Sequence, residues 1–266
     1  MRPEASLHKQ AAWHFLIASL VFALSGIATL FQLNSLLVHL PSISIGLTWT
    51  ILWSLILALN WRGLGWHPYS IFGKANAVTL YRAAGTVLIA GLVPVASELQ
   101  MQWPWLITGL VVLLLSLDGV DGYLARRSGL ASEFGARFDM ETDALLILVV
   151  SVFVWYSGET GIWIISLGLM RYLFVLASLW SKALRGNLYP SFRRKLVCVI
   201  QLVVLCAILS PLLAPPLSDM AGLLALLCLA ASFIRDVLWL YRHRSSDGRS
   251  AAHNAPGIVA SNEITP

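Results

Sequence analysis

The stretch "LDGVDGYLARRSGLASEFGARFDMETD", residues 117–143, gathers charged residues and glycines directly after a long apolar run. Asp118 and Asp121 are three residues apart, and Asp139 and Asp143 are four apart. Residues at these spacings share one face of a helix. The stretch therefore predicts two consecutive helices joined by a turn, with four carboxylates converging between them.

The composition surrounding this stretch is that of a membrane protein. Of the 266 residues, 58% are hydrophobic and only 12% are charged, with a mean hydropathy of +0.77. A soluble domain carries about 25% charged residues. Backbone polar groups must be paired in hydrocarbon, so long apolar runs without strand alternation predict helices. The expected fold class is all-α, a polytopic membrane helical bundle.

Eight apolar segments can be marked along the chain. The first of them is too long for the core of a signal peptide and is expected to be a retained span. The segments are residues 13–33, 43–61, 77–96, 103–122, 142–158, 160–180, 194–213 and 219–241.

The loops between these segments alternate in charge. The N-terminus, the loops containing "WRGLGWHPYSIFGK", "YLARRSG" and "SKALRGNLYPSFRRK", and the end "YRHRSSDGR" are basic, whereas the intervening loops contain no Lys or Arg. By the positive-inside rule, both termini and the acidic stretch face the cytoplasm. The net charge of +5 therefore fits membrane orientation and anionic lipid, and no nucleic-acid partner is expected.

The cysteines and histidines indicate no site of their own. Cys198, Cys206 and Cys228 all fall inside apolar segments, and no Cys or His spacing suggests zinc or a disulfide framework. We expect these cysteines to act as small buried hydrophobic residues.

Four like charges at a low-dielectric boundary would repel one another strongly unless a cation neutralised them. Oxygen-only ligands suit hard divalent ions, so we expect Mg²⁺ or Mn²⁺ at Asp118, Asp121, Asp139 and Asp143. Four acids can hold two ions, as in two-metal phosphoryl-transfer sites. The alternative is an ordinary cytoplasmic loop whose acids face water.

Small residues accompany the aspartates. Gly122 and Ala125 follow on nearly the same helix face, and Gly135 lies one turn before the second acidic pair. They leave room for a bulky ligand beside the carboxylates. Arg126, one turn after Gly122, can offer a planar fork to a phosphate.

These residues carry a resemblance to a known family. The pattern resembles the signature of the CDP-alcohol phosphatidyltransferase family: Asp118-x-x-Asp121-Gly122-x-x-Ala125-Arg126, eight residues, then Gly135-x-x-x-Asp139-x-x-x-Asp143. The resemblance implies a six-helix membrane core, a cytoplasm-facing polar cavity, and transfer of a phosphatidyl or phospho-alcohol group with release of CMP.

The resemblance also implies a division of the chain. The six-helix catalytic core is expected at residues 70–243, preceded by an N-terminal segment, residues 1–69, with two extra transmembrane helices of unassigned role. These helices are expected to pack against the core or to extend a dimer interface. Residues 244–266, rich in small and polar residues, are expected to form a disordered cytoplasmic tail.

Upstream of the signature, "NAVTLYR" is similar to the segment that opens the family's first core helix. Asn76, Thr79 and Arg82 recur every three residues and form a polar stripe suited to the diphosphate of a CDP-linked donor. The alternative is an interfacial helix start without a ligand. The resemblance places this stripe at the donor site, together with Asp118, Gly122, Ala125, Arg126 and Gly135.

By analogy with the family, Asp118, Asp121 and Asp139 act mainly as metal ligands, and Asp143 also takes the proton of the acceptor hydroxyl. The expected reaction transfers a phosphatidyl group from CDP-diacylglycerol to a small polar alcohol in phospholipid biosynthesis. The enzyme is expected to be a homodimer in the inner membrane of a bacterium. One alternative is CDP-choline or CDP-ethanolamine with diacylglycerol. Another is a divalent-cation transporter, disfavoured because the acids gather at one membrane face.

Two further basic features are candidates for binding the acceptor or a phosphate. Arg171 lies mid-span, where a charge costs at least about 2.5 kcal/mol, so we expect it to face the cavity or an acidic partner. Arg193, Arg194 and Lys195 lie in a loop on the side of the metal site. Alternatively, Arg171 forms a structural ion pair, and the three basic loop residues only set the orientation of the protein in the membrane.

Overall fold

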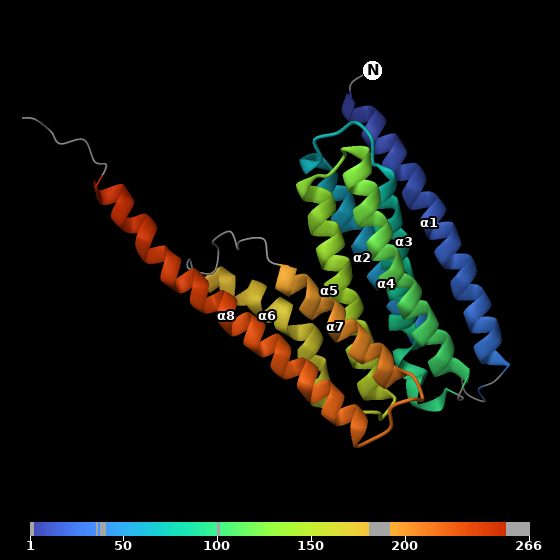
Figure 1. Cartoon of the computed structure of the whole chain (residues 1–266). Helices are drawn as coiled ribbons and strands as arrows, with labels where there is room; N and C mark the ends of the chain where they lie inside the picture. The colour runs from blue at the N-terminus through green and yellow to red at the C-terminus, as the bar shows by residue number, and fades with distance from the viewer. Residues whose placement is uncertain (1–2, 36, 38–40, 100–101, 181–191, 254–266) are drawn as a thin grey trace, which may run out of the picture.

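The structure is a computed structural model that describes all residues except 1–2, 36, 38–40, 100–101, 181–191 and 254–266. For residues 3–5, 192–195 and 240–253 it describes the helical backbone without the side chains. Within these limits the chain consists of helices and their connections, with no strand (Figure 1). The all-α prediction is confirmed.

Eight α-helices and three short 3₁₀ helices follow one another along the described chain. In order they are α1 (Pro3–Asn34), α2 (Ser42–Gly63), η1 (Leu64–Trp66), α3 (Lys74–Leu92), η2 (Val93–Glu98), α4 (Gln102–Ser128), α5 (Glu133–Tyr156), η3 (Ile162–Ile165), α6 (Ser166–Trp180), α7 (Phe192–Leu209) and α8 (Leu217–His253).

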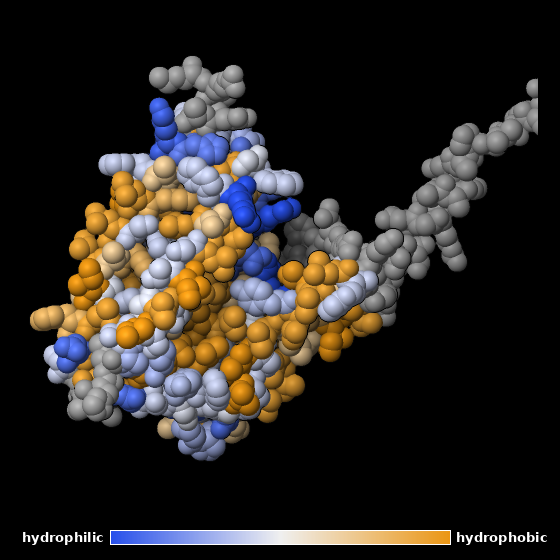
Figure 2. Space-filling model, turned by 180° about the vertical axis from the view of Figure 1, so that it is seen from behind, coloured by the Kyte–Doolittle hydropathy of each residue, from blue (hydrophilic) through white to orange (hydrophobic). Residues whose placement is uncertain are grey.

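Each of the eight predicted apolar segments corresponds to one α-helix. Six helical stretches of the described chain are long and apolar enough to cross a membrane, and the remaining two segments are α5 and α7. Acidic side chains interrupt the first half of α5, and the apolar part of α7, Leu196–Leu209, is short. The rear surface is largely apolar across its middle, with hydrophilic side chains toward both ends (Figure 2). These features confirm a polytopic membrane bundle.

Helix α3 lies at the centre of the bundle. In its most apolar window 72% of residues are buried, against 17–22% in the other five candidate spans. It packs against α1, α2, α4 and α5, and small residues permit this close approach. At Gly85 an added Cβ would come within 2.7 Å of the Leu114 side chain of α4. Because α3 is enclosed, its polar residues lie inside the protein.

The two additional N-terminal helices pack against α3. Trp49 of α2 donates its indole N–H to the carbonyl oxygen of Leu88 at 3.1 Å, and its ring lies against Gly91. Trp53 of α2 donates to Ser19 Oγ of α1 at 3.0 Å. Of the two expected placements, packing against the core is therefore observed.

The last three helices form a second group beside the first five. Helices α7 and α8 pack on each other, α6 packs against α5, and α8 slants away from the bundle (Figure 1). Helix α8 continues to His253, past the boundary expected at residue 243. The helical hydrogen-bond ladder thus runs on from the apolar span into the polar sequence, and the expected tail beyond it lies outside the described residues.

Candidate metal centre and active site

The predicted pair of helices and its turn are present at the acidic stretch. Helix α4 ends at Ser128, and Gly129 follows in the left-handed region at φ +67°, where glycine has no steric penalty. Ser132 then caps α5, its Oγ accepting the backbone N–H of Gly135 at 3.1 Å. The turn reverses the chain, so the two acidic helix faces oppose each other.

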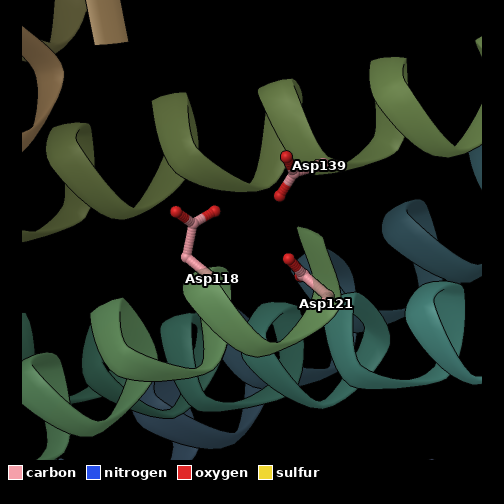
Figure 3. A group of neighbouring side chains, drawn as sticks. All are labelled: Asp118, Asp121 and Asp139. Carbon is pink, nitrogen blue, oxygen red and sulfur yellow. The ribbon is translucent and has the colours of Figure 1, made fainter. Parts of the chain in front are cut away.

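Three of the four aspartates form a compact group between α4 and α5. One carboxylate oxygen from each of Asp118, Asp121 and Asp139 lies within 4.8 Å of the others. Figure 3 shows the first two rising from α4 toward the third on α5. Asp143 follows one turn further along α5. The convergence expected from the helical spacing is thus present.

Arg82 of α3 lies among all four carboxylates. Its Nη1 is 2.7 Å from Asp121 Oδ2 and 2.6 Å from Asp139 Oδ1, and its Nη2 is 3.0 Å from Asp118 Oδ1. Nη2 also donates to Asp143 Oδ1. The Arg82 side chain is only 1% exposed. This residue ties three helices together at one point.

Two further bonds fix the orientation of this cluster. Arg82 Nε donates to the carbonyl oxygen of Leu114 at 3.2 Å, and Thr79 Oγ1 donates to Asp121 Oδ2 at 3.0 Å. With the carboxylates ionised, one guanidinium faces four negative charges, leaving a net charge of −3 (+1 − 4). Like charges this close disfavour one another's ionisation unless a cation joins them.

The donor set fits a hard divalent cation. Mg²⁺ binds oxygens at about 2.1 Å, so two ligands on opposite sides of it lie about 4.2 Å apart. The carboxylate oxygens of Asp118, Asp121 and Asp139 lie within 4.8 Å of one another, which exceeds this ligand-to-ligand distance by less than about 1 Å. Small side-chain rotations can close that difference. Carboxylates without nitrogen or sulfur ligands favour Mg²⁺ or Mn²⁺ over zinc or copper.

The polar stripe predicted on α3 is buried and runs toward the aspartates. Asn76, Thr79 and Arg82 are 7%, 3% and 1% exposed. Asn76 does not reach the carboxylates: its Nδ2 donates to the Phe72 carbonyl oxygen at 2.6 Å, and its Oδ1 faces Gly135. The other two bind the aspartates directly, and donor binding by the stripe stays a prediction.

The small signature residues have different surroundings. A Cβ added at Gly135 would lie 2.7 Å from Asn76 Oδ1, so this glycine permits the close approach of α3 and α5. At Gly122 only the Arg126 guanidinium comes near, at 3.4 Å. Ala125 is half-buried, and Arg126 is exposed. Gly122 and Ala125 therefore leave space beside the aspartate cluster, whereas Gly135 is a packing residue.

The remaining predicted residues lie away from the aspartates or outside the description. Arg171 of α6 donates to Glu141 Oε1 at 2.5 Å, so its partner is an acid on another face of α5. The first turn of α7 contains Arg193, Arg194 and Lys195, whose side chains lie outside the described residues. Their expected acceptor role stays a prediction.

One part of the site has no counterpart in the sequence analysis. His67 is 8% exposed, with Nδ1 3.1 Å from the capping Ser132 Oγ and Nε2 3.0 Å from the Ile71 carbonyl oxygen. Tyr69 donates to the carbonyl oxygen of Gly129 at 3.1 Å. The segment before α3 thus holds the α4–α5 turn, a contact that no residue spacing signals.

A family model described as CDP-alcohol phosphatidyltransferase matches residues 72–234, more than half of the chain. The chain belongs to this family. The matched region contains Arg82 and the four aspartates, and α1 and α2 precede it. Membership identifies the chain as a transferase that acts on CDP-alcohols. No curated protein and no solved structure matches the chain significantly.

Proposed function

We propose that this protein transfers a phosphatidyl group from CDP-diacylglycerol to the hydroxyl of a small polar alcohol, with release of CMP. The observation that carries the proposal is the meeting of four aspartates from two helices around one buried arginine, inside the family-matched region. Phosphoryl transfer depends mainly on positioning and charge neutralisation. A carboxylate cluster that binds divalent cations meets this need.

Asp118, Asp121 and Asp139 would hold Mg²⁺ or Mn²⁺, with Asp143 as a further ligand. Cations held there would supply charge neutralisation for the donor diphosphate and for the CMP leaving group. Arg82 keeps the carboxylates of α4 and α5 facing each other, a positioning role that follows from its contact with all four. The open sides at Gly122 and Ala125 admit the donor.

Asp143 would accept the proton of the acceptor hydroxyl. The acceptor oxygen forms a bond to the β-phosphorus of the donor, and the bond from that phosphorus to the bridging oxygen breaks. The electron pair leaves with CMP, and the proton passes to the carboxylate. Asp143 is suited to this role because it lies beside the compact group of three and is 30% exposed.

The experiment measures CMP release by purified protein. CDP-diacylglycerol is supplied with Mg²⁺ or Mn²⁺ and, in turn, with glycerol 3-phosphate, serine, inositol, inositol phosphate or choline. One of these should release CMP, and a chelator should abolish the release. If CMP forms only from CDP-choline or CDP-ethanolamine with diacylglycerol, the donor carries the headgroup and diacylglycerol is the acceptor. Release that persists in excess chelator would contradict the metal centre.

The proposal places the metal centre at the cytoplasmic face of the cell membrane. Ser128 is the last residue of α4, and Ser97 lies in η2, which precedes the other end of α4. Both are exposed, so cysteines placed there should be labelled from opposite sides in a background without native cysteines. Ser128→Cys should react with a membrane-impermeant maleimide only after the cytoplasmic face is opened. Labelling of both positions from one side would contradict this orientation.

A further inference from the structure

A groove of about 640 Å³ lies on the side of α5 away from the aspartates. One wall is α2, from Leu52 to Gly63, and the other is α5, from Glu133 to Leu145, with Tyr172 of α6 beside it. Its volume falls in the range of small-molecule sites, about 300–1,000 Å³. Because α2 precedes the family-matched region, this groove depends on a helix outside the matched part of the chain.

The groove is separate from the metal centre. On a helix each residue turns about 100°, so Glu141 lies about 200° around α5 from Asp139. Glu141 lines the groove, and Asp139 faces Arg82. Ala83 of α3 also lines the groove, next to the arginine that faces the aspartates. A ligand in the groove would therefore lie behind the catalytic helices.

The groove has the length of one bilayer leaflet. At 1.5 Å per residue, the lining part of α2 rises about 17 Å and that of α5 about 18 Å. One leaflet accounts for half of a hydrocarbon core of about 30 Å. The walls are mainly apolar, and Leu55 and Leu59 are 52% and 57% exposed along it. An acyl chain lying along α2 would cover this surface.

Charged side chains follow one another along the α5 wall. Glu133, Arg137 and Glu141 are spaced by four residues, and all three line the groove. Neither Glu133 nor Arg137 forms an ion pair with another described residue, while Glu141 binds Arg171 of α6. A cation between two carboxylates complements a headgroup that carries both a phosphate and an amine. A purely anionic headgroup would meet repulsion from Glu133, whose charge no ion pair among the described residues offsets.

We propose that this groove binds a zwitterionic glycerophospholipid, whose phosphate meets Arg137, whose amine meets Glu133, and whose acyl chain lies mainly against α2. The site requires α2, and it gives the additional N-terminal helices a role in lipid binding at the back of the catalytic core. It stands independently of the proposed acceptor and donor.

The first test is native mass spectrometry of the whole protein released from nanodiscs of defined lipid. Nanodiscs containing phosphatidylethanolamine, phosphatidylglycerol or added diacylglycerol distinguish the headgroup chemistry. We expect one retained phosphatidylethanolamine, at least 5-fold more abundant than retained phosphatidylglycerol or diacylglycerol. Equal retention of the three lipids would overturn the proposed headgroup recognition.

Paired variants then locate the site. Leu59→Trp places a large ring in the groove and should reduce lipid retention at least 5-fold. Leu47→Trp is the matched control, since it makes the same change at a 57% exposed position of α2 that does not line the groove. Arg137→Gln should lower phosphatidylethanolamine retention without raising that of diacylglycerol. Equal retention by the two tryptophan variants would place the lipid elsewhere and overturn the proposal.

A second copy of the chain is the competing occupant. In that case Leu59→Trp would convert a dimer into a monomer in the same spectra, with lipid retention unchanged, and this result would also overturn the proposal. Melting temperatures measured beside retention should be equal for both tryptophan variants, because both changes are at exposed positions.

Discussion

Helix α5 carries two ionic arrangements on opposite faces, and they differ in burial. On one face Asp139 and Asp143 bind Arg82, which is 1% exposed and contacts four carboxylates. On the other, Glu141 binds Arg171, with side chains 55% and 29% exposed. The first arrangement centres on a buried arginine that joins three helices, whereas the second joins two helices at the surface of the bundle, within a candidate membrane span.

The contribution of an arginine–carboxylate pair to stability depends on how deeply the pair is buried. An exposed ion pair contributes about 0–1 kcal/mol, because water screens it and competes for both partners. Removing one partner from a buried arrangement costs about 3–5 kcal/mol, because an uncompensated charge remains. Function is therefore expected on the buried face, where uncompensated negative charge favours cation binding.

The largest expected effect is a difference in the rate of CMP release between variants on the two faces of α5. Asp143→Asn should lower the rate of CMP release about 100- to 10,000-fold, the usual effect of losing a general base. Glu141→Gln is the matched control on the opposite face and should leave the rate within about 3-fold, since its side chain faces the groove and not the aspartates. Binding of the CDP donor, measured beside turnover, should survive in Asp143→Asn.

Asp118→Asn sharpens the assignment of Asp143. This change removes a charge that would hold the cations, so affinity for Mg²⁺ and turnover should fall together. Equal loss of donor binding in Asp143→Asn and Asp118→Asn would make all four acids ligands and leave the proton without a defined acceptor.

The next effect compares the two arginines by stability. Arg82→Gln should lower the free energy of unfolding by about 3–5 kcal/mol, because four carboxylates lose their shared partner. Denaturant unfolding of the purified protein measures this loss, with the exposed Arg62→Gln as control. Added Mg²⁺ should raise the melting temperature more in Arg82→Gln than in the unsubstituted protein. Similar losses in Arg82→Gln and Arg62→Gln would contradict the buried cluster.

A smaller effect tests the packing between α3 and α5. Gly135→Ala should destabilise the protein by about 1–3 kcal/mol, because overpacking forces neighbouring groups to shift. The added Cβ would lie 2.7 Å from Asn76 Oδ1. Gly119→Ala, with nothing within 4 Å of the added atom, should be neutral or slightly stabilising. Melting temperatures of the two variants check this prediction, and equal values would contradict the close approach of α3 and α5.

The smallest effect belongs to the exposed pair. Arg171→Met keeps an apolar stem of similar length and should change the free energy of unfolding less than Arg82→Gln does, because Arg171 pairs with one carboxylate and Arg82 with four. A double-mutant cycle with Glu141→Gln isolates the coupling of Arg171 and Glu141. A coupling energy above about 2 kcal/mol would mean that this pair is effectively buried, and the contrast between the faces would fail.

Much of the site could be predicted because its acids are neighbours in sequence. Asp118 and Asp121 share a helix face by spacing alone, as do Asp139 and Asp143, and a short turn brings the two faces together. Arg82 was marked as part of a polar stripe. Its position inside the carboxylate cluster depends on the packing of α3 between α4 and α5, which no local pattern encodes.

The contacts that escaped prediction all join segments distant in sequence. His67 reaches the Ser132 cap, and the groove combines α2 with α5 and α6. Such contacts arise from side-chain fit between helices, such as the seating of Trp49 against Gly91. Residue spacing within one helix carries no information on which partner its faces will meet.

The sequence by itself determined the helical membrane class, the family and the acidic helix pair, because hydropathy and helical periodicity act locally along the chain. Tertiary structure alone decided that Arg82 joins all four aspartates, that Arg171 binds Glu141 instead of the metal centre, and that α2 closes a groove behind α5. These outcomes depend on close packing between helices that are distant in sequence, which local periodicity does not specify.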